Sequence, residues 1–452
     1  MTEAPVLAAP PRFRGQLPPR QLLRTIRDSS VATYGEEAFE REVIVRRLLW
    51  ARYLVVNAPA GIERILLGNA DNYRKSPVAR RLLEPGLGKG LLTSEGEEWR
   101  RQRRIMAPAF DHRSIVSYVP QMAETTRAML ARWDLLPDGS TLDIAAEMMR
   151  LTLAIIARAM FSADAEDVGP TVETAVNRYQ LEVRPDVFDL LNIPEWIPRG
   201  RNRNWRKIFH GLDQVIGRMI AREPKEGAQP KDLLARLIAA RDSETGLAMS
   251  AKEVRDQVVT IFMAGHETTA LALAWTWYLL SQHPEEEARF HAEIDARFGA
   301  ELPGFDDVTN LVHARMVLQE SMRLYPPAHT ISRQSLAADE VAGHRVRKGA
   351  LVFIVPWVVH RHRLLWERPE VFDPERFTAE RSAARPRFAY LPFGGGPRVC
   401  IGASFAMTEA ALILAMVGRR YRLRLVPDHP VEPVGLITLR PRHGLRMILE
   451  RR

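Results

Sequence analysis

The chain contains a single cysteine, Cys400, among its 452 residues. One cysteine forms no internal disulfide, and it cannot supply the several thiolates of a four-cysteine zinc or iron–sulfur site. The fold must therefore be held by a packed core, for which 46% hydrophobic residues provide ample material. We expect a cytoplasmic protein, because thiols stay reduced in that compartment.

The N-terminal residues also lack the long apolar run of a signal sequence or membrane anchor. The first apolar run, Val6 to Ala9, covers four residues before prolines and arginines interrupt it, which is far short of a signal core or a membrane span. The chain has no internal repeat and no Gly/Ser-rich linker. We therefore expect a loose Pro-rich leader over residues 1–20 and one domain over residues 21–452.

The charge is unbalanced, with a formal net charge of +9. This excess fits a nucleic acid, an anionic lipid or an acidic protein as partner. The sequence has no zinc-ligand spacing, RNA-binding signature or long basic tail. An acidic protein partner therefore ranks first, and no nucleic acid is expected.

Hydrophobic spacing predicts a mainly α fold with small β-sheets. Apolar residues recur at helical spacing from about Met122 to Asp295. The strand-like segments are short and come late, over residues 341–346, 350–355, 434–439 and 444–450.

One predicted helix is unusually long. It opens at Ser250, with Glu253 three residues later as in a capping box, and continues to His283. At ~1.5 Å per residue it extends on the order of 50 Å, enough to cross a membrane or a whole globule. The segment His266–Thr269 places ionisable and polar side chains at its middle, where a bilayer would penalise them. A buried core helix is therefore preferred, and no membrane span is expected.

Gly265, in the middle of that helix, costs about 1 kcal/mol relative to alanine. It indicates either a flat ligand pressed against the backbone or an accidental kink. Thr268 and Thr269 can also bend the helix by bonding to carbonyls four residues earlier. The residues alone leave both interpretations open.

Cys400 lies within the glycine-rich decapeptide Phe393–Gly402. Gly394–Gly396 and Pro397 predict a tight loop that allows close backbone approach. The apolar stretch after Cys400 is typical of a helix, whose N-terminus would stabilise a thiolate.

A plain buried cysteine is the simplest alternative for this residue. A cysteine nucleophile is disfavoured because no histidine lies close in sequence and no hydrolase signature is present. A phosphate loop is disfavoured because the P-loop lysine and the βαβ setting are missing. Haem is the cofactor that takes a single protein thiolate.

The sequence resembles the cytochromes P450, a family of haem-thiolate monooxygenases. The decapeptide matches the family's haem loop at Phe393, Gly396, Arg398, Cys400 and Gly402. Further family motifs occur in order at Trp99 with Arg103, Ala264–Thr269, Glu320 with Arg323, and Pro374–Phe377. Together they span roughly residues 95–445, most of the chain.

The resemblance implies the cytochrome P450 fold, a single haem domain with a long central helix, and haem b ligated through Cys400. It implies propionate contacts from Trp99, Arg103, Arg333 and Arg398. It implies further haem contacts from Phe393, Gly396, Gly402, Ala264 and Gly265. Trp99 and Arg103 also share one helix face, although the same segment fits an ordinary basic surface helix.

The resemblance also assigns the chemistry, which is activation of O₂ at the haem iron. Glu267 would relay protons, and Thr268 would orient the bound oxygen species. Glu320, Arg323 and Arg376 would form a buried network that supports the haem loop rather than take part in catalysis.

The substrate pocket is expected to be apolar, which favours a hydrophobic fatty acyl, terpenoid, steroid or aromatic substrate. By family position its walls come from the loop between Tyr73 and Leu92 and from three later segments. The residues assigned from those segments are Ile261, Phe262, Ala328, Ile331, Leu436 and Ile437.

Electrons are expected from a separate ferredoxin or flavodoxin with its reductase, because no fused reductase domain is recognisable. The Arg100–Arg104 cluster and Arg398 would attract an acidic partner, or they serve only solubility. We expect a monomer. The alternatives to a monooxygenase are a haem-thiolate sensor without turnover and a haem-free cysteine transferase.

His360 and His362 have a spacing that would fit a metal site on a strand, but a packing role is preferred.

Overall fold

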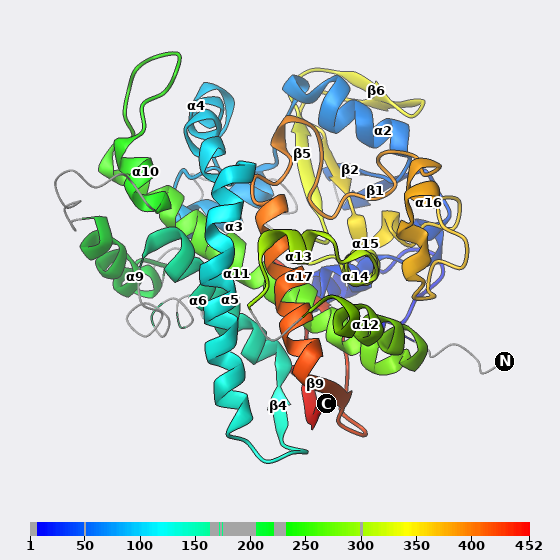
Figure 1. Ribbon diagram of the computed structural model, residues 1–452. Helices are drawn as coiled ribbons and strands as arrows, with labels where there is room; N and C mark the ends of the chain where they lie inside the picture. Colours follow the sequence, from blue (N-terminus) through cyan, green and yellow to red (C-terminus); the bar gives the residue numbers. More distant parts are fainter. Residues whose placement is uncertain are drawn as a thin grey trace.

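The computed structural model describes residues 7–48, 51–162, 171, 174, 205–220, 232–298 and 302–452. Long helices dominate the chain, and the described residues also form four small sheets (Figure 1). This is the predicted mainly α fold class. The helices of ten or more residues are α1 (Pro19–Asp28), α3 (Pro77–Leu87), α4 (Gly96–Met106), α5 (His112–Asp134), α6 (Ile144–Phe161), α9 (Trp205–Ile220), α11 (Ala251–Gln282), α12 (Pro284–Arg297), α14 (Val312–Leu324) and α17 (Ala403–Arg420).

Shorter helices connect these elements. They are α2 (Pro59–Glu63), α10 (Leu233–Ala239), α13 (Phe305–Thr309), α15 (Pro356–Val359) and α16 (Ala379–Ala383).

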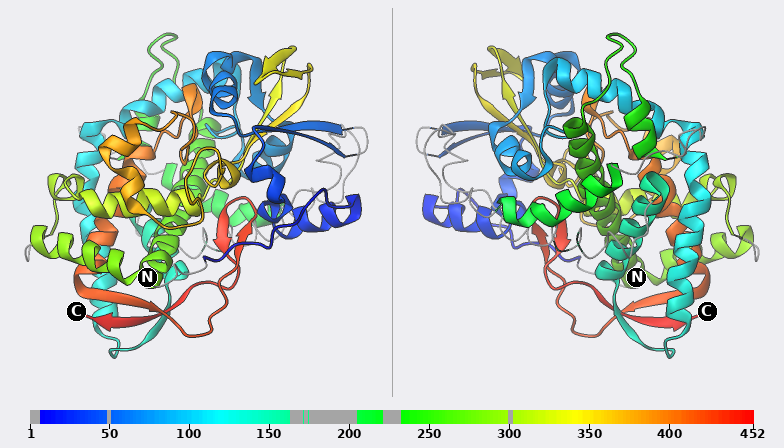
Figure 2. Two further views of the ribbon diagram at one scale, coloured as in Figure 1. Left: turned by 90° about the vertical axis from the view of Figure 1, so that its right-hand side faces the viewer. Right: turned by 90° about the vertical axis from the view of Figure 1, so that its left-hand side faces the viewer.

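The largest sheet has five strands in the order β1-β2-β8-β5-β3. Only the β2–β8 pair in it is parallel. These strands are β1 (Val43–Leu48), β2 (Ala51–Val56), β3 (Tyr73–Lys75), β5 (Ile331–Ser335) and β8 (Leu351–Ile354). Figure 2 shows this sheet at the opposite end of the molecule from the three-stranded sheet β4-β12-β9.

The remaining strands form the three-stranded sheet and two hairpins. They are β4 (Thr141–Asp143), β9 (Tyr421–Leu425), β12 (Arg446–Arg451), β6 (Asp339–Val341) paired with β7 (His344–Val346), and β10 (Pro433–Gly435) paired with β11 (Leu439–Pro441).

Two of the four expected strands differ from the sequence prediction. Residues 341–346 form a hairpin instead of one strand, because Ala342 and Gly343 adopt φ angles of 48° and 73° and reverse the chain. Residues 434–439 are likewise divided between β10 and β11 by a turn. The segments at 350–355 and 444–450 contain β8 and β12 as predicted.

Helix α11 is the central element, as predicted. Ser250 and Glu253 form the capping box that starts it, and His283 follows its last turn. It packs against α6, α14 and α17. It is also the one helix, among the residues described, that is long and apolar enough to cross a membrane. Most of that stretch is buried inside the fold, as in the core helix of a soluble protein.

Part of the N-terminal leader, residues 1–20, contacts the domain. The backbone of Ala8 accepts a hydrogen bond from Tyr325 (2.9 Å) and donates one to Tyr278 (3.3 Å). Arg12 pairs with Glu370 and lies over the ring of Phe39. Residues 1–6 of the leader lie outside the described residues.

Candidate haem-thiolate site

The decapeptide forms a tight loop closed by a hydrogen bond from the Cys400 amide to the Phe393 carbonyl (2.9 Å). Gly394 and Gly396 adopt φ angles of 74° and 67°, which favour glycine. A Cβ on Gly396 would overlap the carbonyl oxygen of Leu66. The close approach predicted from the glycines is therefore made, at this position, to the chain's own backbone.

Cys400 lies two residues before Gly402, the N-cap of α17. Its side chain is accessible, yet the surrounding protein is dense enough that burial raises the pKa of the thiol. The Gly402 amide and the charge of Arg103 act in the opposite direction and lower that pKa. The helix terminus alone therefore does not produce the predicted thiolate. A metal ion bound at the sulfur would do so, because coordination deprotonates a thiol.

The middle of α11 has an accessible patch. From residue 256 to residue 280 every residue is buried except Ala264, Gly265 and Thr268. These three lie on one helix face because they are spaced i, i+1 and i+4. The Thr268 hydroxyl donates to the Ala264 carbonyl (2.8 Å), and the Thr269 hydroxyl donates to that of Gly265 (3.2 Å).

Gly265 has a packing role that sequence reasoning missed. A Cβ at this position would lie 2.7 Å from Cδ1 of Ile156, on α6. The glycine thus allows α6 to cross α11 closely. This packing is a reason for the glycine beside the two that the sequence left open, a flat ligand or an accidental kink, and the haem contact of Gly265 stays a prediction.

Three cationic side chains gather beside the loop. Lys75 on β3 stands directly opposite Arg333 on β5 in the antiparallel register, and Arg398 of the loop is close enough to lower the pKa of both. Like charges at opposed strand positions are destabilising without a counter-ion. Desolvation and these neighbours lower the pKa of Lys75 to about 7 and that of Arg333 to about 10.

Glu95 is the acidic partner of this group. It pairs with Arg398, while the Lys75 ammonium donates to the carbonyls of Leu91 and Ser94 (both 2.9 Å). When Lys75 is protonated, the three cations face one carboxylate and leave two positive charges, which matches the two carboxylates of haem. The Nη1 atom of Arg398 is buried and has no hydrogen-bond partner among the described residues. The residues present therefore fit haem.

The predicted propionate contacts divide into two groups. Trp99 belongs to the cationic cluster. The guanidinium carbon of Arg398 lies 4.5 Å from the centre of the Trp99 ring. Arg103 instead donates to the carbonyl of Val399 (2.7 Å), next to Cys400. Lys75 was missed from the sequence, because only the pairing of β3 with β5 places it here.

Glu267 directly precedes Thr268 in α11 but is not part of the accessible patch. Its side chain is buried, and Oε1 accepts hydrogen bonds from the Thr438 hydroxyl (2.6 Å) and from Arg440 (2.9 Å). Both partners lie at β11 or in the turn before it. The structure thus connects the predicted proton relay to the late hairpin.

The predicted pocket residues are not all equivalent. Phe262 is fully buried and stacks on Phe161 of α6, with ring centres 4.5 Å apart, so it belongs to the core and not to a pocket wall. Ala328, Ile331, Leu436 and Ile437 retain accessible surface, whereas Ile261 is almost buried. His329 joins two of these segments through a hydrogen bond between Nε2 and the Leu436 carbonyl (3.0 Å).

The three residues of the expected structural network are in contact and buried. Arg323 donates to both oxygens of Glu320 (2.6 and 2.7 Å), and Arg376 Nε lies 3.4 Å from Glu320. Arg323 also donates to the carbonyls of His360 and Pro369. Nearly all donors and acceptors of this buried group are thereby paired.

The expected basic face is largely neutralised by the chain itself. Arg101 pairs with Glu253, and Arg104 pairs with Asp242 and Glu244. Arg100 pairs with Asp71 and Glu97, both of them highly exposed. Of the three, Arg100 is the most exposed and the most available to a partner.

His360 and His362 do not form a metal site. His360 accepts from the Leu391 amide (3.0 Å), whereas His362 contacts the Arg41 carbonyl (3.1 Å). Across the residues that the structure describes, no group of three or more His, Cys, Asp or Glu side chains could hold a metal ion.

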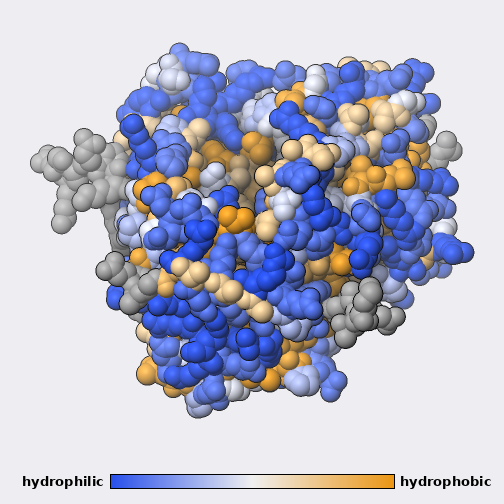
Figure 3. Space-filling model, turned by 45° about the vertical axis from the view of Figure 1, so that its right-hand side comes forward, coloured by the Kyte–Doolittle hydropathy of each residue, from blue (hydrophilic) through white to orange (hydrophobic). Residues whose placement is uncertain are grey.

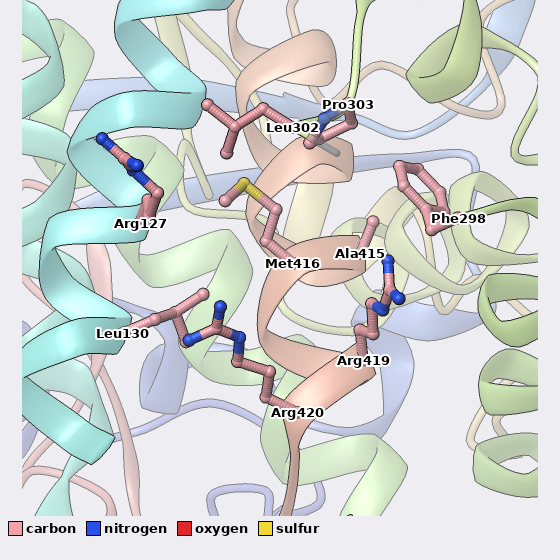
Figure 4. A pocket seen from close by; sticks show the side chains of 9 residues that line it. All are labelled: Arg127, Leu130, Phe298, Leu302, Pro303, Ala415, Met416, Arg419 and Arg420. Carbon is pink, nitrogen blue, oxygen red and sulfur yellow. The ribbon is translucent and has the colours of Figure 1, made fainter. Parts of the chain in front are cut away.

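The surface offers a further groove that is remote from Cys400. Figure 3 shows one mostly hydrophilic face with hydrophobic residues in a hollow. A different pocket, of about 370 Å³, lies at the C-terminal end of α17. Figure 4 shows the side chains that line it. Its lining includes Leu130, Phe298, Met416, Arg127, Arg419 and Arg420.

Comparison with known proteins places this geometry in a family. The family model described as cytochrome P450 matches residues 39–443. Cyclooctatin synthase of Streptomyces melanosporofaciens is 37% identical over 396 residues, covering 87% of this chain and 85% of that protein. Cyclooctat-9-en-7-ol 5-monooxygenase of the same organism is 38% identical, covering 85% and 83%.

More distant matches agree. Pentalenene oxygenase of Streptomyces avermitilis is 34% identical, covering 81% of this chain and 80% of that protein. The crystal structure of the cytochrome P450DA heme domain superposes with a TM-score of 0.80 at 26% identity, covering 91% and 90%. The chain belongs to the cytochrome P450 family and is a P450 monooxygenase.

Proposed function

We propose that this monooxygenase inserts one oxygen atom of O₂ into a hydrophobic cyclic substrate of terpenoid type. The observation that carries the proposal is the accessible Cys400 loop beside a cluster with two uncompensated positive charges. The apolar character of Ile331, Leu436 and Ile437 supports a substrate with few polar groups. Two relatives are named for cyclooctat-9-en-7-ol and pentalenene, which supports the same class.

The chemistry that haem b supplies when bound is activation of O₂ at its iron. Cys400 would ligate the metal, and its thiolate would donate electron density to it. Lys75, Arg333 and Arg398 would neutralise the two haem carboxylates. Residues 21–452 would form the single haem domain.

Thr268 would hold a proton at its hydroxyl, on the accessible face of α11. In the structure this hydroxyl donates to the Ala264 carbonyl, so its oxygen can accept a hydrogen bond from a ligand. Rotation away from Ala264 would let it donate instead. Glu267, one residue earlier, would resupply that proton from within the core.

Electrons would come from a separate cytoplasmic ferredoxin or flavodoxin with its reductase, and the protein would act as a monomer. The exposed Arg100 is the residue of the predicted basic face that best fits an acidic partner.

The test combines a spectrum with a turnover assay. The reduced protein with carbon monoxide should show the red-shifted Soret band of thiolate ligation, and Cys400→Ala should abolish it. Cyclic terpenoids screened by the haem spin-state change should yield a hydroxylated product when electrons are supplied. A colourless protein or a histidine-type spectrum would overturn the proposal. Thiolate ligation without product from any ligand would instead indicate a sensor.

A further inference from the structure

The Glu267 carboxylate is held by two donors that are far from it in sequence. Thr438 and Arg440 both bond to Oε1, at 2.6 and 2.9 Å. The Glu267 side chain is 3% exposed, whereas that of Arg440 is 21% exposed. Burying a carboxyl group this deeply is costly unless it has such hydrogen-bond partners. The position of Glu267 therefore depends on the β10–β11 hairpin.

The hairpin is itself fastened at several points. The Leu439 amide donates to the Pro327 carbonyl (3.0 Å), and the Trp275 indole donates to the Leu439 carbonyl (3.1 Å). The turn of the hairpin contains Leu436, whose carbonyl contacts His329. The turn therefore contacts both the segment before β5, through His329, and α11, through Glu267.

We infer that Arg440 and Thr438 are positioning residues that fix the orientation of the Glu267 carboxylate for proton transfer to Thr268. The inference rests on the proposed function. Arg440 does not carry the proton, because a guanidinium stays protonated in proteins. Its role is to occupy Oε1 together with Thr438, so that Oε2 is the oxygen left to exchange a proton.

Removing the charge of Arg440 should impair proton delivery while sparing substrate binding. In Arg440→Gln we expect proton-dependent turnover to slow about tenfold, the lower end of what loss of a supporting contact costs. The solvent isotope effect should rise, and the product formed per electron should fall. Arg440→Lys keeps the charge and should restore part of the activity. Thr438→Val should give a smaller loss in the same direction.

A double-mutant cycle separates positioning from structure. In a Glu267→Gln background, Arg440→Gln should cause no further change in the isotope effect or in product per electron. Thermal unfolding of the wild type, the two single variants and the double variant gives a readout apart from activity. The changes in melting temperature should be coupled between residues 267 and 440. Arg442→Gln is the matched control, because Arg442 pairs with the exposed Glu432 near the same strand. That control should behave like the wild type.

The outcomes distinguish this inference from the proposed function. If wild-type protein shows no thiolate spectrum or forms no product, the proposed function fails. If wild-type protein turns over but Arg440→Gln matches Arg442→Gln, only the positioning role is overturned. Equal effects of Arg440→Gln with and without Glu267 would also overturn it.

Discussion

The guanidinium of Arg398 lies over the indole ring of Trp99, with 4.5 Å between the guanidinium carbon and the ring centre. This stacking holds a loop arginine against α4, where Glu95 pairs with it. Two sequence motifs more than 290 residues apart, in α4 and in the cysteine loop, therefore meet in one cationic cluster. Lys75 and Arg333 complete that cluster from neighbouring strands.

We predict that Lys75 contributes to haem binding. Desolvation is the main cause that lowers the pKa of Lys75 to about 7. When no haem carboxylate is present, the amine is therefore charged below pH 7 and neutral above it. Haemin affinity of the apoprotein should therefore fall as the pH rises above 7. Lys75→Met should lower affinity at pH 6 by about tenfold and remove this pH dependence.

Haemin titrations of the apoprotein between pH 6 and pH 8.5, followed by Soret absorbance, check this prediction. Lys348→Met is the control, because Lys348 is an exposed lysine on the loop between β7 and β8. Identical titrations of the Lys75 and Lys348 variants would remove Lys75 from the haem site.

Those parts of the site that depend on local sequence were predictable. The capping box at Ser250 and the loop glycines impose their geometry through residues only a few positions apart. The contact of Glu320 with Arg323 follows from their i, i+3 spacing on a helix.

The remaining parts depend on contacts between distant segments. Lys75 faces Arg333 only through the register of β3 on β5, which no single segment encodes. The α6 side chain against Gly265 and the bond of Arg440 to Glu267 likewise depend on how separate elements pack. Phe262 was assigned to the pocket because helix periodicity does not tell which neighbour covers a given apolar face.

We predict that Arg104 stabilises the fold, whereas Arg100 is available to a redox partner. Arg104 donates to both oxygens of Asp242 (2.9 and 3.1 Å), and these contacts hold the pKa of that carboxyl well below its usual range. Arg104→Glu should lower the melting temperature by several degrees. It should reduce both partner-driven and peroxide-driven turnover.

Arg100→Glu is the matched variant for this comparison, because its acidic neighbours are exposed. It should leave the melting temperature unchanged, slow partner-driven electron transfer and flatten its salt dependence. Peroxide-driven turnover should be spared. If Arg100→Glu lowers both activities equally, the docking role is wrong.

We predict that Glu409 makes stability depend on pH. This α17 side chain is fully buried, and burial raises its pKa well above 4.5, so it is neutral in the folded protein. In the unfolded chain the Glu409 carboxyl ionises above pH 4.5. The contribution of Glu409 to the free energy of unfolding therefore falls as the pH rises above 4.5. Glu409→Gln should gain stability relative to wild type by up to about 1.4 kcal/mol per pH unit.

Denaturant unfolding at pH 5, 6, 7 and 8 measures that gain. Glu450→Gln on β12 is the control, because the Glu450 side chain is partly exposed and the same substitution is made there outside the core. A difference for Glu409→Gln that is independent of pH would show that the carboxyl is ionised in the fold.

We predict that Thr268, but not Thr269, determines how efficiently electrons are used for product. Both hydroxyls bond to carbonyls four residues earlier, so both contribute similarly to the local helix geometry. Only Thr268 lies on the accessible face, whereas Thr269 is buried beside Glu409. Thr268→Ala should keep haem content and substrate affinity, while product per reducing equivalent falls several-fold and hydrogen peroxide accumulates.

Thr269→Ala is the internal control for that experiment, since it removes an equivalent hydroxyl from the other side of the helix. It should leave the ratio of product to reducing equivalents near the wild-type value, and Thr268→Ser should recover it because the hydroxyl is restored. If the helix bend were what mattered, both alanine variants would lower the ratio alike. An unchanged ratio in Thr268→Ala would remove this threonine from proton delivery, and the positioning of Glu267 by Arg440 would then have to serve another acceptor.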